Sequence, residues 1–315
     1  MQWHERVGRR LKLRDLHILL AVLQHGSMAK AAGILAISQP AVSKAITDLE
    51  HTLGVRVLDR TRRGVQPTVF GSALGRRGLV IFDEVKQCVS ELAFLADPTR
   101  GELRIASSES LAAGILPAIT DAMFRQYPGV VMHVVQTVLS ELQYEDLRNR
   151  KVDIWLGRIA EPFLQSDLHA DILFDDPIAI VVGNGNRWAR RRKPKLSDLV
   201  SERWVLPPPD TLAGVLIAEL FQKQGLPLPA APVRTLSLHL TANLLATNQY
   251  VATLPLSLLR FDVAGREFKM LNIDLPAQDR AVAVVSVKSR TSNPIARLFI
   301  ERAHFVARPL ARKAT

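Results

Sequence analysis

The fold of the first part of the chain is decided by residues 27–54, which read SMAKAAGILAISQPAVSKAITDLEHTLG. Ser27 and Ser38 each stand before an apolar helical pattern, where a hydroxyl caps free backbone N–H groups. Pro40 falls in the first turn of the second pattern, where its missing N–H costs nothing. Gly54 follows the last apolar residue and suits a left-handed helix end. The stretch therefore predicts two successive helices, the second covering residues 39–53.

The predicted helix 39–53 has two chemically different faces. Its apolar residues recur at helical spacing and should face a core; they are Ala41, Val42, Ala45, Ile46, Leu49 and Leu53. The opposite face is small and polar, with Pro40, Ser43, Lys44 and Thr47. Short side chains let a helix approach base edges in a major groove. There Gln39, Ser43 and Thr47 can form hydrogen bonds, and Lys44 can meet a phosphate or a guanine. The spacing alone leaves open a small helical bundle with a solvated polar face.

The flanking sequence completes a winged helix-turn-helix pattern. Leucines from Leu13 to Leu23 predict an earlier helix, and the alanine-rich stretch after Ser27 permits a close crossing of two helices. Short strands are predicted at 55–58 and 65–68. The turn between them carries Arg62 and Arg63, which would reach phosphates or a minor groove.

These residues resemble the DNA-binding domain of LysR-type transcriptional regulators. The resemblance is carried by residues 27–32 (SMAKAA), 35–44 (LAISQPAVSK), 49–50 (LE) and 53–61 (LGVRVLDRT) and is nearly continuous from Leu13 to Gly71. It implies that Gln39, Pro40, Ser43, Lys44 and Arg63 contact DNA, and we add Ser38, Thr47 and Arg62 as DNA-binding candidates. Lys44 stands where the family usually has arginine, which keeps the charge but loses the bidentate fork.

The resemblance also implies the assembly and the partners. A bacterial homo-oligomer, commonly a dimer of dimers, would bind a dyad-symmetric site on double-stranded promoter DNA, respond to a small-molecule effector and act on RNA polymerase. No cofactor and no membrane partner are expected, and the expected location is the cytoplasm. The effector, the target genes and the choice between activation and repression are left open.

A long helix, about residues 69–95, carries a near-heptad stripe. Its members are Phe70, Leu74, Arg77, Ile81, Val85, Cys88, Leu92 and Leu95. An apolar stripe of this kind packs against a partner helix, and the resemblance favours an antiparallel dimer of two linker helices. The alternative is that the stripe packs against the winged domain of the same chain. We expect Cys88 to be a buried residue of this stripe rather than a redox sensor.

After a hinge at 97–101 the period changes to alternating strands and helices, which predicts α/β structure with parallel pairing. With the resemblance, the fold class is mixed: an α-rich winged helix-turn-helix domain, a long linker helix, and a two-lobed α/β domain like periplasmic binding proteins. The predicted domains are 11–69, 70–97 and 98–308. Lobe I covers about 99–172 and 277–308, and lobe II covers about 173–276.

Polar residues at predicted strand ends and helix starts indicate a small-molecule site. The candidates are Ser107, Ser108, Glu109, Thr137, Arg158 and Thr211; the resemblance places an effector between two lobes, with Ser107, Ser108 and Thr137 at matching positions. Each hydroxyl is alternatively a plain helix cap. Because Glu109 would repel an anion, a hydroxylated or sugar-like effector is a hypothesis.

Composition narrows the function classes. The formal charge of +11 over 315 residues favours a polyanionic partner. The single cysteine excludes an intrachain disulfide and points to a reduced compartment. No apolar signal-peptide core opens the chain, and polar residues interrupt its longest uncharged run. The basic run 187–195 is interpreted as a solvated loop.

No nucleophile elbow, phosphate-binding glycine loop or zinc motif occurs, so enzyme is the weaker class. Two alternatives remain: a small-molecule-processing enzyme with a DNA-binding arm, and an effector-independent architectural DNA binder.

Overall fold

The protein is described from a computed structural model that covers residues 10–61, 64–137, 144–159, 163–261, 268–276 and 281–311. The chain divides into two compact units, Met1–Cys88 and Val89–Thr315. Each unit is described by itself below. Among the described helices, none is both long enough and apolar enough to cross a bilayer.

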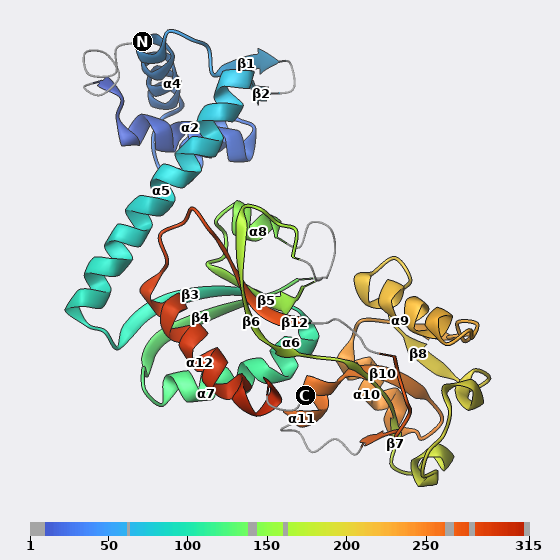
Figure 1. The fold of residues 1–315 in the computed structure, drawn as a ribbon. Helices are drawn as coiled ribbons and strands as arrows, with labels where there is room; N and C mark the ends of the chain where they lie inside the picture. Colours follow the sequence, from blue (N-terminus) through green and yellow to red (C-terminus); the bar gives the residue numbers. More distant parts are fainter. Residues whose placement is uncertain are drawn as a thin grey trace. The chain divides into compact units, whose positions relative to one another are not determined.

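The N-terminal unit is a three-helix bundle with a β-hairpin and the first turns of a long helix (Figure 1). Its elements are α2 (Leu13–His25), α3 (Met28–Ile34), α4 (Gln39–Leu53), β1 (Leu58–Thr61), β2 (Gly64–Pro67) and α5 (Val69–Ala96). β1 and β2 pair in antiparallel fashion. Apolar residues at helical spacing on α2 and α4, among them Leu16, Leu19, Val42 and Leu49, form one fully buried core.

The helix boundaries of this unit follow from capping residues. Ser27 and Ser38 accept hydrogen bonds from Lys30 N and Ala41 N, at 3.4 and 3.3 Å. Gly26 and Gly54 end α2 and α4 in the left-handed region, with φ of 63° and 72°. The predicted caps and the predicted bounds of α4 are therefore confirmed. The strands begin three residues later and one residue earlier than predicted.

Helix α5 has one tightly packed face in the N-terminal unit. Gly71, Gly75 and Gly78 are buried there. A methyl group added at Gly71 would lie 1.9 Å from the carbonyl oxygen of Val57, and one at Gly75 would lie 2.7 Å from Leu23 Cδ1. Glycine at these positions lets α5 approach the bundle closely, at the helix-propensity cost of about 1 kcal/mol per residue.

The near-heptad stripe of α5 lies away from the glycine face. Within this chain Phe70 is 57% exposed, Ile81 38%, Val85 43% and Leu92 62%. Only Leu74 of the stripe packs against the core of the unit. The stripe as a whole therefore does not pack on its own winged domain. Cys88 is exposed in the single chain, and its expected burial in a seam between two helices stays a prediction.

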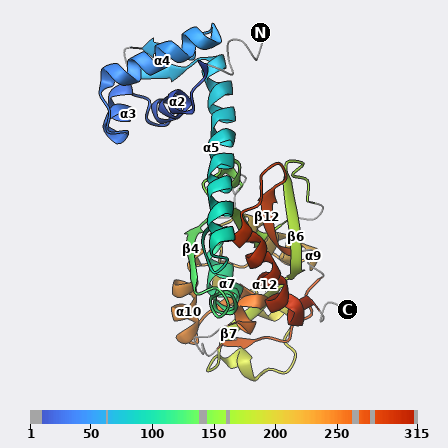
Figure 2. The same cartoon turned by 90° about the vertical axis from the view of Figure 1, so that its left-hand side faces the viewer.

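The C-terminal unit contains two five-stranded mixed sheets, which define two lobes (Figure 1). The first lobe holds β3 (Arg100–Ser107), α6 (Glu109–Ala113), α7 (Ile115–Phe124), β4 (Gly129–Gln136), α8 (Glu145–Arg148), β5 (Ile154–Arg158), β6 (Leu168–Asp175), β12 (Ala281–Val287) and α12 (Pro294–Ala311). Its strand order is β4-β3-β5-β12-β6. Helices α7 and α12 lie side by side against this sheet (Figure 2).

The second lobe is an insertion between β6 and β12. It holds β7 (Ile178–Gly183), the 3₁₀ turns η2 (Arg187–Arg190) and η3 (Leu196–Leu199), β8 (Trp204–Leu206), α9 (Leu212–Lys223), β9 (Val233–Arg234), α10 (Leu238–Ala246), β10 (Val251–Pro255), α11 (Leu256–Arg260) and β11 (Phe268–Met270). Its strand order is β11-β7-β10-β8-β9. The first crossing between the lobes is short, because β6 ends at Asp175 and β7 begins at Ile178.

Two features of this unit differ from the sequence-based expectation. Parallel pairing holds for β3 with β4 and β5, but β12 runs antiparallel to β5 and β6, and β7 runs antiparallel to β10 and β11. Strand β12 is antiparallel because the chain leaves the first sheet after β6 and returns to it from the second lobe. Helix α12 continues to Ala311, three residues beyond the predicted domain end at 308.

Candidate functional site

The polar face of α4 is open to solvent. Gln39, Pro40, Lys44 and Thr47 are exposed, and Ser43 is partly exposed. The opposite face is buried, with Val42 0% and Leu49 1% exposed. The two-faced pattern predicted from spacing is thus present, with small polar groups and one cation on the outer side.

Local hydrogen bonds set the geometry of this face. Ser38 caps the helix through its hydroxyl, so that oxygen serves the helix itself. Thr47 Oγ1 donates to the carbonyl oxygen of Ser43 at 2.9 Å. Gln39 and Lys44 are therefore the two long polar side chains at the exposed start of the helix.

The hairpin after α4 is fixed by the carboxylate of Glu50, which belongs to the stretch that carries the family resemblance but is not among the predicted site residues. Glu50 Oε1 accepts from Val57 N at 2.7 Å and from Leu58 N at 3.2 Å. The backbone N–H of Val65 donates to the Gly26 carbonyl at 3.1 Å, which ties β2 to the turn between α2 and α3. The hairpin tip candidates Arg62 and Arg63 lie outside the described residues.

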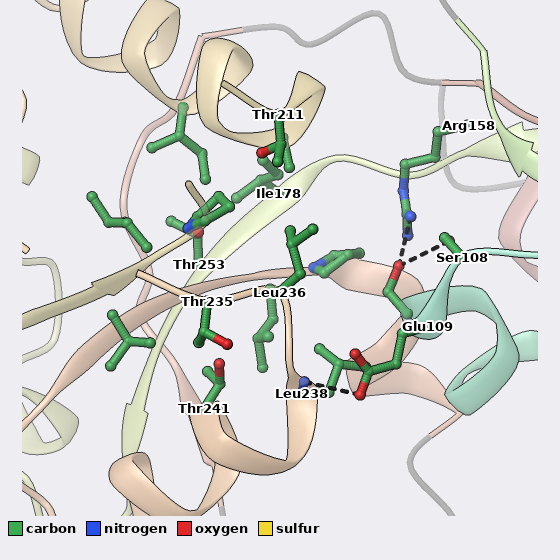
Figure 3. Close-up of a pocket in the computed structure, with 18 of the residues that line it drawn as sticks. Ser108, Glu109, Arg158, Ile178, Thr211, Thr235, Leu236, Leu238, Thr241 and Thr253 are labelled. Atoms are coloured by element: carbon green, nitrogen blue, oxygen red, sulfur yellow. Dashed lines mark hydrogen bonds between the residues drawn. The ribbon is translucent and has the colours of Figure 1, made fainter. Parts of the chain in front are cut away.

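A cavity of about 360 Å³ lies between the two lobes of the C-terminal unit (Figure 3). Its lining comes from strand ends and helix starts of both lobes. Five of the six predicted effector residues line it; they are Ser108, Glu109, Thr137, Arg158 and Thr211. A volume of this size is typical of small-molecule sites.

Ser107 does not line the cavity, and that prediction is wrong. Its side chain is fully buried, and its hydroxyl donates to the Leu156 carbonyl at 3.0 Å across the sheet. Neighbouring residues at a strand end point to opposite sides, so Ser107 is turned into the sheet while Ser108 borders the cavity.

Arg158 borders the cavity but is held by a buried partner. Its Nη2 and Nε donate to Asp176 Oδ2 at 2.5 and 3.1 Å, and its Nη1 donates to Ser110 Oγ at 2.8 Å. The side chains of Arg158 and Asp176 are 7% and 0% exposed. Asp176 also accepts from the backbone N–H and the hydroxyl of Ser257, both at 2.7 Å. The network joins β5, the crossing between the lobes, and α11.

Glu109 links the two lobes directly. Its Oε1 accepts from the backbone N–H of Leu238 at 3.1 Å, at the start of α10 (Figure 3). A carboxylate at a helix N-terminus is favoured by the helix dipole. The charge of Glu109 thus has a structural partner on the opposite wall of the cavity.

Several lining residues were not predicted. Ser110, Thr235, Thr241 and Thr253 add hydroxyl groups to the cavity. The hydroxyl oxygen of Thr253 is buried and has no hydrogen-bond partner in the described part of the chain. Ser110 follows two predicted residues, so proximity alone would have suggested it. Thr253 lies inside a strand, where no local signal separates a cavity residue from a core residue.

The charged residues outside the cavity include the basic run 187–195 of the second lobe. No group of three potential metal ligands occurs among the described residues. The basic run begins as the 3₁₀ turn η2 rather than as a plain loop. Two of its cations face carboxylates, Arg187 with Glu202 and Lys193 with Asp274.

Comparison with known proteins gives matches over both units. A family model described as "Bacterial regulatory helix-turn-helix protein, lysR family" matches residues 13–72, and one described as "LysR substrate binding domain" matches residues 96–306. The uncharacterized HTH-type transcriptional regulator YdcI of Escherichia coli K12 is 27% identical over 263 residues, covering 84% of this chain and 85% of that protein.

Solved structures have the same fold. A full-length OxyR variant from Pseudomonas aeruginosa aligns with a TM-score of 0.67 at 20% identity, covering 97% of this chain and 98% of that one. Full-length CbnR in complex with its target DNA aligns with a TM-score of 0.54 at 20% identity, covering 94% of this chain and all of that one.

Proposed function

The chain belongs to the LysR family of transcriptional regulators, and from this premise we propose that α4 reads promoter DNA while a small molecule in the interlobe cavity controls the outcome. The observation that carries the proposal is the two-faced α4, whose apolar side is buried and whose polar side is exposed. A recognition helix needs this arrangement, because its outer side chains must reach base edges.

Each polar residue of α4 receives a role in this proposal. Gln39 and Ser43 hydrogen-bond to base edges, and Lys44 neutralises a phosphate or donates to guanine. Pro40 and Thr47 pack against the groove wall, and Ser38 holds the first turn in place. Arg62 and Arg63 of the hairpin tip contact the backbone or the neighbouring minor groove.

The cavity is the proposed effector site, and it binds its ligand without turning it over. Glu109 and the Arg158–Asp176 network already connect residues of both lobes. An effector changes the regulator only if it binds two lobe arrangements with unequal affinity. Closing of the lobes around the ligand would change the strength of the Glu109 contact with α10.

The exposed stripe of α5 is the proposed dimer contact. Apolar side chains on one face of a long helix are stabilised by a second helix of the same kind. A dimer places two α4 helices for a dyad-symmetric site, and two such dimers would form the tetramer. Contact with RNA polymerase and a cytoplasmic location complete the proposal.

Footprinting tests the proposal. Full-length protein is added to DNA from upstream of its own coding region and to a scrambled fragment of equal length at the same salt. We expect a protected, dyad-symmetric site on the first fragment only. Equal affinity for both fragments would identify an architectural binder and refute the proposal.

A further inference from the structure

The cavity lining carries an unbalanced negative charge. Among its described residues only Glu109 and Arg158 are charged. The Arg158 guanidinium is matched by the buried Asp176 carboxylate at 2.5 Å, and its remaining nitrogen donates to Ser110. An anionic ligand would therefore find no unmatched cation in this part of the lining, and it would meet the Glu109 carboxylate.

A cationic ligand is not favoured either. Glu109 accepts the Leu238 N–H at the start of the nine-residue helix α10. The positive end of the helix dipole partly compensates the carboxylate. A ligand ammonium would have to compete with this contact between the lobes.

Hydroxyl groups are the main polar feature of the lining. Seven of its described residues carry one; they are Ser108, Ser110, Thr137, Thr211, Thr235, Thr241 and Thr253. Thr211 and Thr241 already donate their hydroxyl protons to the carbonyl oxygens of Pro208 and Ser237. A hydroxyl that donates still accepts through its oxygen, so these groups suit ligand hydroxyls, which can donate to them. The buried hydroxyl of Thr253, which has no hydrogen-bond partner among the described residues, is a group that such a ligand would satisfy. The apolar part of the lining comes mainly from the second lobe, with residues such as Ile178, Val205 and Ile217.

We propose that the effector is an uncharged, polyhydroxylated molecule of the sugar or polyol class; this inference rests on the proposed role of the cavity as effector site. Its hydroxyls bond to the serines and threonines of both lobes, and its C–H surface packs on the aliphatic residues of the second lobe. The proposal has two grounds: the hydroxyl groups of the lining are complementary to ligand hydroxyls, and the charges of the lining disfavour an anion.

Matched probes test the ligand class by titration calorimetry on the full-length protein. Two series keep one sugar ring and replace a single group on it: D-glucose, D-glucuronate (a carboxylate in place of the C6 hydroxymethyl group) and D-glucosamine (an ammonium in place of the C2 hydroxyl), and the corresponding galactose compounds. We expect a neutral member to bind at least tenfold tighter than its acid and its amine. In Glu109→Gln, which keeps an oxygen for the Leu238 N–H, we expect the discrimination against the acid to shrink several-fold.

A second variant separates ligand contact from folding. Thr253→Val removes a buried hydroxyl that has no partner in the part of the chain that the structure describes, so the ligand-free melting temperature should stay constant or rise. Affinity for the neutral probe should fall at least fivefold, whereas Thr120→Val on α7, outside the lining, should leave it unchanged.

Two results would overturn the proposed class: tighter binding of the acid than of the neutral sugar in both series, or binding of none of the probes. Neither result touches the footprint on promoter DNA, so failure of the ligand class is distinguishable from failure of the proposed function.

Discussion

Removing the negative charge of Asp176 should destabilise the C-terminal unit strongly. In Asp176→Asn, the Arg158 guanidinium stays buried, at 7% side-chain exposure, without a countercharge. Breaking a buried pair of this kind costs about 3–5 kcal/mol. For a unit of this size, that free energy corresponds to a melting temperature lowered by roughly 6–20 °C.

A surface pair provides the matched control for this substitution. Asp121 bonds Arg125 at 2.8 Å with side chains 63% and 78% exposed, and exposed pairs contribute about 0–1 kcal/mol. Asp121→Asn should therefore lower the melting temperature by only a few degrees or less. The double variant Arg158→Met/Asp176→Leu should recover much of the loss, because it removes both charges.

Thermal unfolding followed by circular dichroism gives the comparison. If Asp176→Asn melts no lower than Asp121→Asn, the guanidinium is not held by this carboxylate. The argument that Arg158 is unavailable to an anionic ligand would then fail as well.

Two further predictions concern α5. Ile81→Glu places a charge in the exposed stripe and should convert the oligomer into smaller species in sedimentation velocity. Leu79 is equally exposed on the opposite side of the helix, so Leu79→Glu should leave the oligomer intact. Equal behaviour of both variants would show that the stripe is not the dimer contact. Gly71→Ala drives a methyl group against the Val57 carbonyl and should destabilise the N-terminal unit by about 1–3 kcal/mol, whereas Gly33→Ala, with open space at its Cβ, should be neutral or stabilising. Denaturant unfolding measures the free energy of unfolding of both glycine variants. An unchanged unfolding midpoint for Gly71→Ala would contradict the close packing of α5 against Val57.

The N-terminal unit was predictable because its signals are local. A serine before a helix and a glycine after it fix the bounds of α4 within a few residues of sequence. The strand start was misplaced by three residues because Glu50 binds the backbone N–H groups of Val57 and Leu58. That contact joins residues seven and eight positions apart, and helical or strand spacing does not reveal it.

The C-terminal unit was less predictable because its decisive contacts are distant in the chain. Strand β6 carries no clear strand pattern in its sequence, because residues 168–175 alternate charged and apolar groups irregularly at a sheet edge. The partner of Arg158 lies 18 residues further on, at the crossing between the lobes. Which of Ser107 and Ser108 borders the cavity depends on the strand register, which the spacing alone does not give.

The polar face of α4 as the DNA-reading surface is tested most directly by fluorescence anisotropy with the footprinted operator. If the Lys44 amine contacts a guanine, Lys44→Ala should weaken operator binding by about 1–3 kcal/mol. If the amine contacts a phosphate, the loss of affinity should be the same for all DNA sequences, and the slope of log affinity against log salt concentration should become smaller by about 1. Lys223→Ala, an exposed lysine on α9, is the charge-matched control and should leave the affinity unchanged. Equal operator affinity and equal salt dependence for wild type, Lys44→Ala and Lys223→Ala would contradict the assignment of α4.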